Sequence, residues 1–198
     1  RSLWFLLSIV ISMHLPAAIA AQSLPKPGIG LLIPATDLEV VRAKITQEPW
    51  ASQFSRIKAK ADGLLQKWPE DKQKMDDRLE MILDLTIEFD AVTQDEGARE
   101  MAKTLATHMQ TRMTPTAFVY LLTGHERYAQ AALDVLETAA RVNRWGWFNW
   151  SGAAMPQIHA GMYARNSAFT ADFIWSALND HQRTRVRDIL AEKIVEPY

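Results

Sequence analysis

The sequence predicts an all-α protein, because its apolar residues recur at helical spacing and alternating strand-like patterns extend over only a few residues. The clearest pattern follows His125, where one apolar stripe takes every third or fourth position. Its members are Ala129, Ala132, Leu133, Leu136, Ala139 and Ala140. Patterns of this kind divide the chain into roughly six to eight helices joined by short turns.

The first predicted helix follows a lead-in segment over 21–35. Prolines and glycines punctuate this segment, so it is too broken to be helical. Thr36 and Glu39 then have the spacing of a capping box, in which the Glu39 side chain reaches back to the Thr36 amide. We therefore expect a helix over 37–47.

Prolines set the bounds of the second predicted helix. Pro49 suits the first position of a helix, and Pro69 is expected to end it. The charged segment 70–78 is then a solvated loop or a helix entry. Segment 79–89 is apolar nearly all round, which is typical of a helix covered on both sides.

An amphipathic helix is predicted over 97–113. Thr114 and Pro115 resemble a cap followed by a first-turn proline, and they open a short helix over 117–122. Gly124 is expected to end that short helix, because glycine is the residue most often found just past a helix C-terminus.

Two more helices complete the pattern. The apolar residues of the first are Met162, Phe169, Phe173 and Ile174. Asn179 is placed to cap the last helix, because Asn accepts well from the free amides of a first turn. Its expected inner face consists of Val186, Ile189, Leu190 and Ile194.

The N-terminal residues 1–20 have the pattern of a cleaved signal peptide. The apolar run 3–13 follows a positive first residue, and small residues at 18–20 fit a cleavage site after Ala20. The run is shorter than the ~20 residues that span a bilayer. We expect a periplasmic or secreted protein with no membrane attachment after cleavage, consisting of the lead-in 21–35 and one domain over 36–198.

Composition narrows the possible partners. The formal net charge is −1, so the strongly basic character typical of nucleic-acid binding is missing and no nucleic-acid partner is expected. The chain has no cysteine, which excludes disulfides and thiolate metal sites. It starts at Arg1 and stops at Tyr198 within a helical pattern, and we therefore interpret it as a fragment of a larger protein.

The segment 144–166, RWGWFNWSGAAMPQIHAGMYARN, is the strongest candidate for a binding site. Aromatic faces beside amide, imidazole and guanidinium groups suit a large hydroxylated or anionic ligand. The expected substrate-binding residues are Trp145, Trp147, Asn149, Trp150, His159, Tyr163, Arg165 and Asn166. The alternative is structural: the tryptophans fill gaps between helices, and the polar residues make helix caps or interhelical hydrogen bonds.

Arg165 and Asn166 could bind a carboxylate, because Arg offers bidentate geometry and Asn a neutral donor. His159 and Tyr163 lie four residues apart and share a helix face, although a structural role is the better interpretation of this pair. His108 and His181 have charged surroundings and are expected to be exposed. Ligand-like spacing of His and acidic residues is missing, so neither a metal nor another cofactor is expected.

Three stretches resemble heparinase II/III-like and alginate-lyase-like polysaccharide lyases. The first, over 30–62, is GLLIPATDLEVVRAKITQEPWASQFSRIKAKAD, which is similar to their read-in strand and first two helices. The second, over 118–140, is FVYLLTGHERYAQAALDVLETAA, similar to a helix-turn-helix of these proteins. The third, over 162–198, resembles the pair of helices ahead of their catalytic groove.

The resemblance implies an incomplete α/α toroid, the N-terminal part of an exported enzyme that cleaves an acidic, uronate-containing polysaccharide by β-elimination. The family's catalytic Asn-His and Tyr motifs have no match in this chain, so it is expected to contribute groove wall and no catalytic residue. Two alternatives remain. An α/α-barrel glycoside hydrolase needs two carboxylates in the cleft, for which Asp172 is the main candidate; a helical-repeat binding module would need a regular period.

Overall fold

The computed structural model describes residues 25–76, 79–82, 96–150, 153–156 and 158–196. Within these ranges the chain is helical apart from one two-stranded hairpin, which confirms the all-α prediction. The described part of the chain contains seven α-helices: α1 (Leu38–Lys44), α2 (Trp50–Asp76), α3 (Glu96–Thr107), α4 (Met113–Thr123), α5 (Glu126–Ala140), α6 (Ile158–Ile174) and α7 (Asp180–Leu190). Strands β1 (Trp147–Trp150) and β2 (Ala153–Pro156) pair between α5 and α6.

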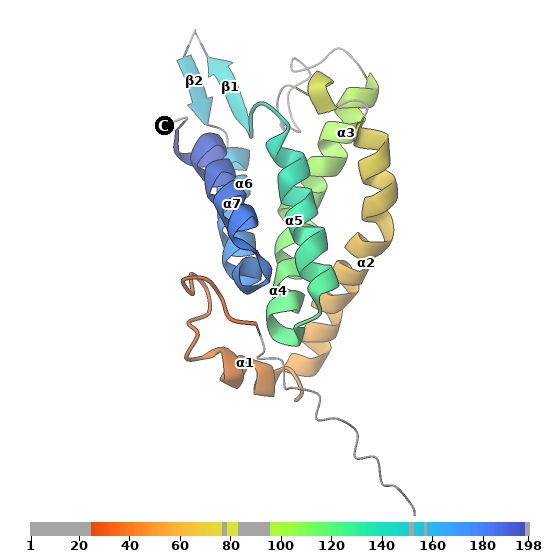
Figure 1. Cartoon of the computed structure of the whole chain (residues 1–198). Coiled ribbons are helices and arrows are strands. Elements are labelled where there is room, and N and C mark those ends of the chain that lie inside the picture. The colour runs from red at the N-terminus through yellow and green to blue at the C-terminus, as the bar shows by residue number, and fades with distance from the viewer. Residues whose placement is uncertain (1–24, 77–78, 83–95, 151–152, 157, 197–198) are drawn as a thin grey trace, which may run out of the picture.

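The long helices lie side by side and alternate in direction along the chain (Figure 1). Hydrogen bonds fix α2 parallel to α5, because partners advance together along both helices. The Tyr128 hydroxyl donates to Asp62 at 2.6 Å, Trp68 Nε1 to Asp134 at 2.6 Å and Arg141 to Asp76 at 2.6 Å. The antiparallel helix α4 packs against both.

Helix α4 forms the centre of the core. Its sequence MTPTAFVYLLT is apolar on every side, so all of its faces must be covered. Helices α2, α5 and α6 pack along it, and α1 touches its C-terminal end. Gly124 ends α4 as predicted, since its φ of 74° is a left-handed conformation that glycine adopts without strain.

Two further sequence predictions are confirmed. The stripe predicted after His125 is buried along α5, with its six members at most 7% exposed. Asn179 caps α7 in a capping box, in which its side chain accepts from Gln182 N and the Gln182 side chain accepts from Asn179 N. Val186 and Ile189 form the buried face of that helix.

The capping box predicted at Thr36 is wrong. The N-cap of α1 is Asp37, whose side chain makes no capping hydrogen bond, and the Thr36 hydroxyl donates to Asp37 Oδ1 at 3.1 Å. Glu39 pairs with Arg42 instead. Arg42 also donates to the carbonyl oxygens of Pro25 and Leu121, so its guanidinium ties α1 to the lead-in and to α4.

The predicted end of the second helix before Pro69 is also wrong, because α2 continues to Asp76 and takes in most of the expected loop 70–78. Pro69 is exposed, so its ring faces solvent. An interior proline costs a helix about 3 kcal/mol. Tertiary contacts offset that cost here, since Trp68 is buried and both Trp68 and Lys72 bind Asp134.

The helix predicted over 97–113 is continuous with the next one, so Thr114 is not a cap. A π-helical segment, His108–Arg112, joins α3 to α4. The Thr114 hydroxyl makes an interhelical hydrogen bond, donating to the carbonyl oxygen of Asn166 on α6 at 3.1 Å. The predicted signal peptide over 1–20 and residues 83–95 lie outside the described residues. Of the helix predicted over 79–89, Leu79–Met81 form a short 3-10 helix.

The lead-in is held by one carboxylate near the end of α6. Asp172 is 4% exposed, and its oxygens accept from the amides of Ile29, Gly30 and Leu31 at 2.6, 3.0 and 3.0 Å. Its carbonyl oxygen accepts from Gly28 N at 2.8 Å. A negative charge near a helix C-terminus is unfavourable. These amide donors compensate for it and fix the lead-in against α6.

Replacing Asp172 with Ala should lower the free energy of unfolding by about 2–4 kcal/mol, because three amides lose a charged acceptor. Urea denaturation of the two proteins measures the difference. Asp180→Ala is the matched control, since that carboxylate is exposed and pairs only with Arg183 among the described residues. Equal stability losses in the two variants would contradict this account of Asp172.

Candidate functional site

The aromatic segment forms the β1–β2 hairpin at the end of α5. Its register pairs Trp147 with Pro156, and Trp150 with Ala153. The side chains of Trp147, Asn149 and Trp150 lie outside the described part of the structure, so their predicted ligand contacts stay predictions. The hairpin backbone is placed beside the start of α6, which β2 contacts (Figure 1).

Gly146 brings the hairpin onto α6. Its φ is 78°, and a Cβ there would lie 2.6 Å from the backbone nitrogen of Ala160 and 3.1 Å from the carbonyl carbon of His159. Only glycine allows so close an approach of two backbones. The aromatic segment is therefore fixed against the first turn of α6, which carries His159.

Trp145 belongs to the core, which agrees with the structural alternative and not with its predicted stacking on a ligand. It is 1% exposed, and its Nε1 donates to the carbonyl oxygen of Ala139 at 2.8 Å. That carbonyl lies in the last turn of α5 and also accepts from Val142 N at 3.0 Å. Trp145 thus closes the end of α5 before the hairpin begins.

Asn166 is also structural. It is 5% exposed, and its Nδ2 donates to the carbonyl oxygens of Met109 and Gln110, both at 3.1 Å. These carbonyls belong to the π-helical segment, whose irregular hydrogen bonding favours acceptors for a side chain. Asn166 therefore locks α6 to the junction of α3 and α4, and it is not available for a substrate carboxylate.

His159 and Tyr163 face each other on α6, as their spacing predicts, with ring centroids 6.4 Å apart. Tyr163 is fully buried, and its hydroxyl accepts from Gln110 Nε2 at 3.3 Å. His159 is 8% exposed, and among the described residues its Nδ1 has no hydrogen-bond partner. Buried polar atoms are normally hydrogen-bonded, so this ring nitrogen is an unused donor or acceptor at the start of α6.

Arg165 is the exposed cation of the predicted site. Its only hydrogen bond within the described residues joins Nε to Asn166 Oδ1 at 3.3 Å. Most of its donors are therefore directed to solvent, and guanidinium donors suit a carboxylate. Of the eight predicted binding residues, His159 and Arg165 are those whose described side chains keep capacity for a ligand.

The expectation that His108 is exposed is wrong, whereas His181 is exposed as predicted. His108 is 1% exposed; Nε2 lies 2.8 Å from Asp71 Oδ2, and the ring packs edge-on against Trp68. Burial lowers the pKa of His108 below its usual value of 6.5, and the hydrogen bond to Asp71 opposes this effect. The charged sequence neighbours of His108 suggested an exposed side chain. The fold instead buries it, because α2 extends past Pro69 and places Asp71 beside the ring.

Carboxylates give little support to the glycoside hydrolase alternative. Asp172 is occupied by the lead-in amides. Burial, followed by the neighbouring Asp134 carboxylate, raises the pKa of Glu137 on α5. Asp134 itself is held by Trp68 and Lys72. A glycoside hydrolase would need a second, unpaired carboxylate near Glu137 to act as a base. The described residues do not supply one.

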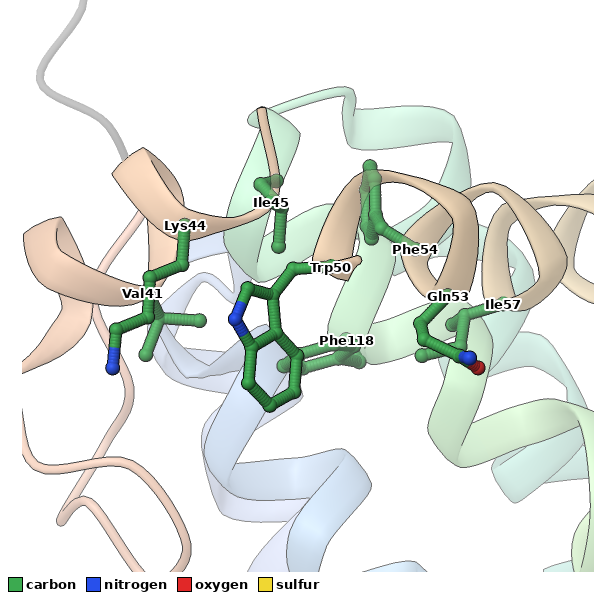
Figure 2. A pocket seen from close by; sticks show the side chains of 8 residues that line it. All are labelled: Val41, Lys44, Ile45, Trp50, Gln53, Phe54, Ile57 and Phe118. Carbon is green, nitrogen blue, oxygen red and sulfur yellow. The ribbon is translucent and has the colours of Figure 1, made fainter. Parts of the chain in front are cut away.

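A pocket that sequence reasoning missed lies at the opposite end of the helices from the hairpin. It lies between α1, α2 and α4, has a volume of about 370 Å³, and is walled mainly by apolar side chains (Figure 2). Trp50 forms one side and is 52% exposed. No sequence pattern predicts this pocket, because its walls come from three helices whose packing the periodicity does not specify.

Within the described ranges, no group of three or more His, Cys, Asp or Glu side chains is arranged to hold a metal ion. None of the described helices is long and apolar enough to cross a membrane. Comparisons with models of protein families, with curated proteins and with solved structures found no match to this chain.

The burial of His108 predicts a pH-dependent stability. Its folded pKa is lowered, so the unfolded chain binds the proton more readily, and stability falls as the pH drops through about 6.5 towards the folded pKa. His108→Gln should flatten this dependence between about pH 7.5 and pH 5.

Urea denaturation at a series of pH values measures the slope, whatever the absolute stability of the variant. His181→Gln is the matched control, because that ring is exposed. The account fails if His108→Gln keeps the slope of the parent protein or if His181→Gln removes it.

Proposed function

We propose that this chain is the N-terminal helical part of an exported polysaccharide lyase that acts on a uronate-containing polysaccharide. It would form part of an incomplete α/α toroid, with the catalytic residues supplied by a longer protein. The three family-like stretches support the proposal. Within these stretches, α4 with α5 and α6 with α7 are consecutive helices that pack against each other across a short turn, and such helical hairpins are the unit from which toroids are built.

The single observation that carries the proposal is the placement of the aromatic hairpin against the start of α6. Gly146 lies on the backbone of His159, whose buried Nδ1 has no hydrogen-bond partner among the described residues. Further along α6, Arg165 is exposed. Tryptophans, an imidazole nitrogen and a guanidinium on neighbouring segments match the rings, hydroxyls and carboxylates of an acidic polysaccharide.

In β-elimination, the substrate carboxylate is neutralised, a base removes the C5 proton and an acid protonates the leaving oxygen. Arg165 is suited to the first role, because its guanidinium is exposed and always charged. Tyr163 is unsuited to proton transfer, since it is fully buried. The chain therefore contributes wall and carboxylate recognition, and the acid and base lie outside it.

Affinity electrophoresis through gels containing alginate, a heparin-type glycan or neutral dextran tests this function. The two acidic polymers should retard the chain, and dextran should retard it much less. Arg165→Gln should weaken retardation by roughly two- to fivefold, as expected for one exposed ion pair. Trp147→Ala and Trp150→Ala should weaken it about fivefold or more, because tryptophans dominate contact energies.

Arg185→Gln and Trp50→Ala are the matched controls, because both residues are exposed and belong to other surfaces. Circular dichroism confirms that each variant is folded. The proposal is overturned if no polyuronate retards the chain, or if the control variants weaken binding as much as those at the hairpin and α6.

A further inference from the structure

We propose that the pocket between α1, α2 and α4 binds a small amphiphile with an apolar tail and an anionic head, such as a medium-chain carboxylate. This inference does not depend on the polysaccharide function, because the pocket lies at the other end of the helices from the hairpin (Figures 1 and 2). The eight lining residues are Val41, Lys44, Ile45, Trp50, Gln53, Phe54, Ile57 and Phe118.

The walls of the pocket suit an apolar tail. Phe54, Ile57 and Phe118 are half-buried, whereas the Trp50 indole, which is 52% exposed, stands at one side (Figure 2). Leaving so large an aromatic ring in water is unfavourable. An apolar ligand would cover the ring and the half-buried side chains behind it.

The size of the pocket favours a small molecule over a protein segment. Its volume of about 370 Å³ is within the range of small-ligand sites. At roughly 30 Å³ for each non-hydrogen atom, comparable to a water molecule in the liquid, it holds about twelve such atoms. A ten-carbon carboxylate has that size, whereas a helix of a partner protein needs a much longer groove.

The polar groups at the rim select an anionic head. Lys44 makes no ion pair among the described residues, and its side chain extends along the α1 side of the pocket (Figure 2). Within the same part of the chain, Trp50 Nε1 and the side-chain amide of Gln53 make no hydrogen bond. These three groups offer donors at the edge of an otherwise apolar pocket, which is the usual arrangement of a ligand site.

The charges along α2 add to this preference. Arg56 and Lys60 fall three and seven residues after Gln53, on the same stripe as the pocket residue Ile57. Neither makes an ion pair within the described residues. The nearby carboxylate Glu48 accepts from the Ser52 hydroxyl at 2.7 Å. On the α2 side, Arg56 and Lys60 thus add positive charge to that of Lys44.

Isothermal titration calorimetry with decanoate tests the inference, with all ligands kept below their micellar concentrations. Decanoate should bind with a dissociation constant on the order of 100 µM. Decanol should bind more weakly because it lacks the charge, and decyltrimethylammonium more weakly still. The chain contains both the pocket and the hairpin, so no truncation is needed.

Trp50→Ala should weaken binding of decanoate and decanol alike, by about tenfold, since the aromatic wall is lost. Lys44→Gln should weaken decanoate about three- to fivefold and leave decanol unchanged, because only the head loses its partner. Lys103→Gln, an exposed lysine on α3, is the matched control and should change neither.

Three results overturn the inference: no measurable binding of decanoate, unchanged binding in folded Trp50→Ala protein, or cationic and anionic amphiphiles bound equally well. Failure here is distinguishable from failure of the polysaccharide function. Trp50→Ala leaves polyuronate retardation intact if the two sites are separate, and Trp147→Ala leaves decanoate binding intact.

Discussion

The need to bury α4 on all sides is the constraint on which the rest of the structure depends. Its eleven residues carry no charge, so neighbours must cover every face. Helices α2, α5 and α6 cover it. Polar groups that become buried where these helices meet α4 then need hydrogen-bond partners. Asn166 and Thr114 perform this task at the π-helical junction, where α6 crosses the start of α4. The two proposed binding surfaces lie at opposite ends of this core.

At both ends, single residues attach irregular segments to the helices. Asp172, near the C-terminus of α6, accepts hydrogen bonds from the lead-in amides, and Arg42 joins the same lead-in to α1 and α4. At the opposite end, Trp145 closes α5 and Gly146 seats the hairpin on α6. Each attachment fixes a surface segment that would otherwise lack apolar contacts sufficient to order it.

Sequence periodicity predicted the elements whose environment is local or one-sided. The stripe on α5 and the Asn179 cap needed only spacing and residue type. Pro69 and Thr114 were misinterpreted because distant residues determine their roles: Asp134 helps to hold α2 together past the proline, and Asn166 occupies the threonine hydroxyl. Of the predicted site, Asn166 is structural for the same reason, since its partners lie in the π-helical junction of α3 and α4, whereas Trp145 binds Ala139 only six residues earlier, at the end of α5.

The central claim is that the hairpin and the exposed part of α6 form a wall for an acidic polysaccharide, a role consistent with the capacity left at His159 and Arg165. Hydrogen–deuterium exchange of the chain, with and without an oligouronate, tests it most directly. The account predicts slower exchange over 144–166 with the oligouronate and no change with a neutral oligoglucan. Protection confined to other segments, or equal protection by the neutral sugar, would contradict it.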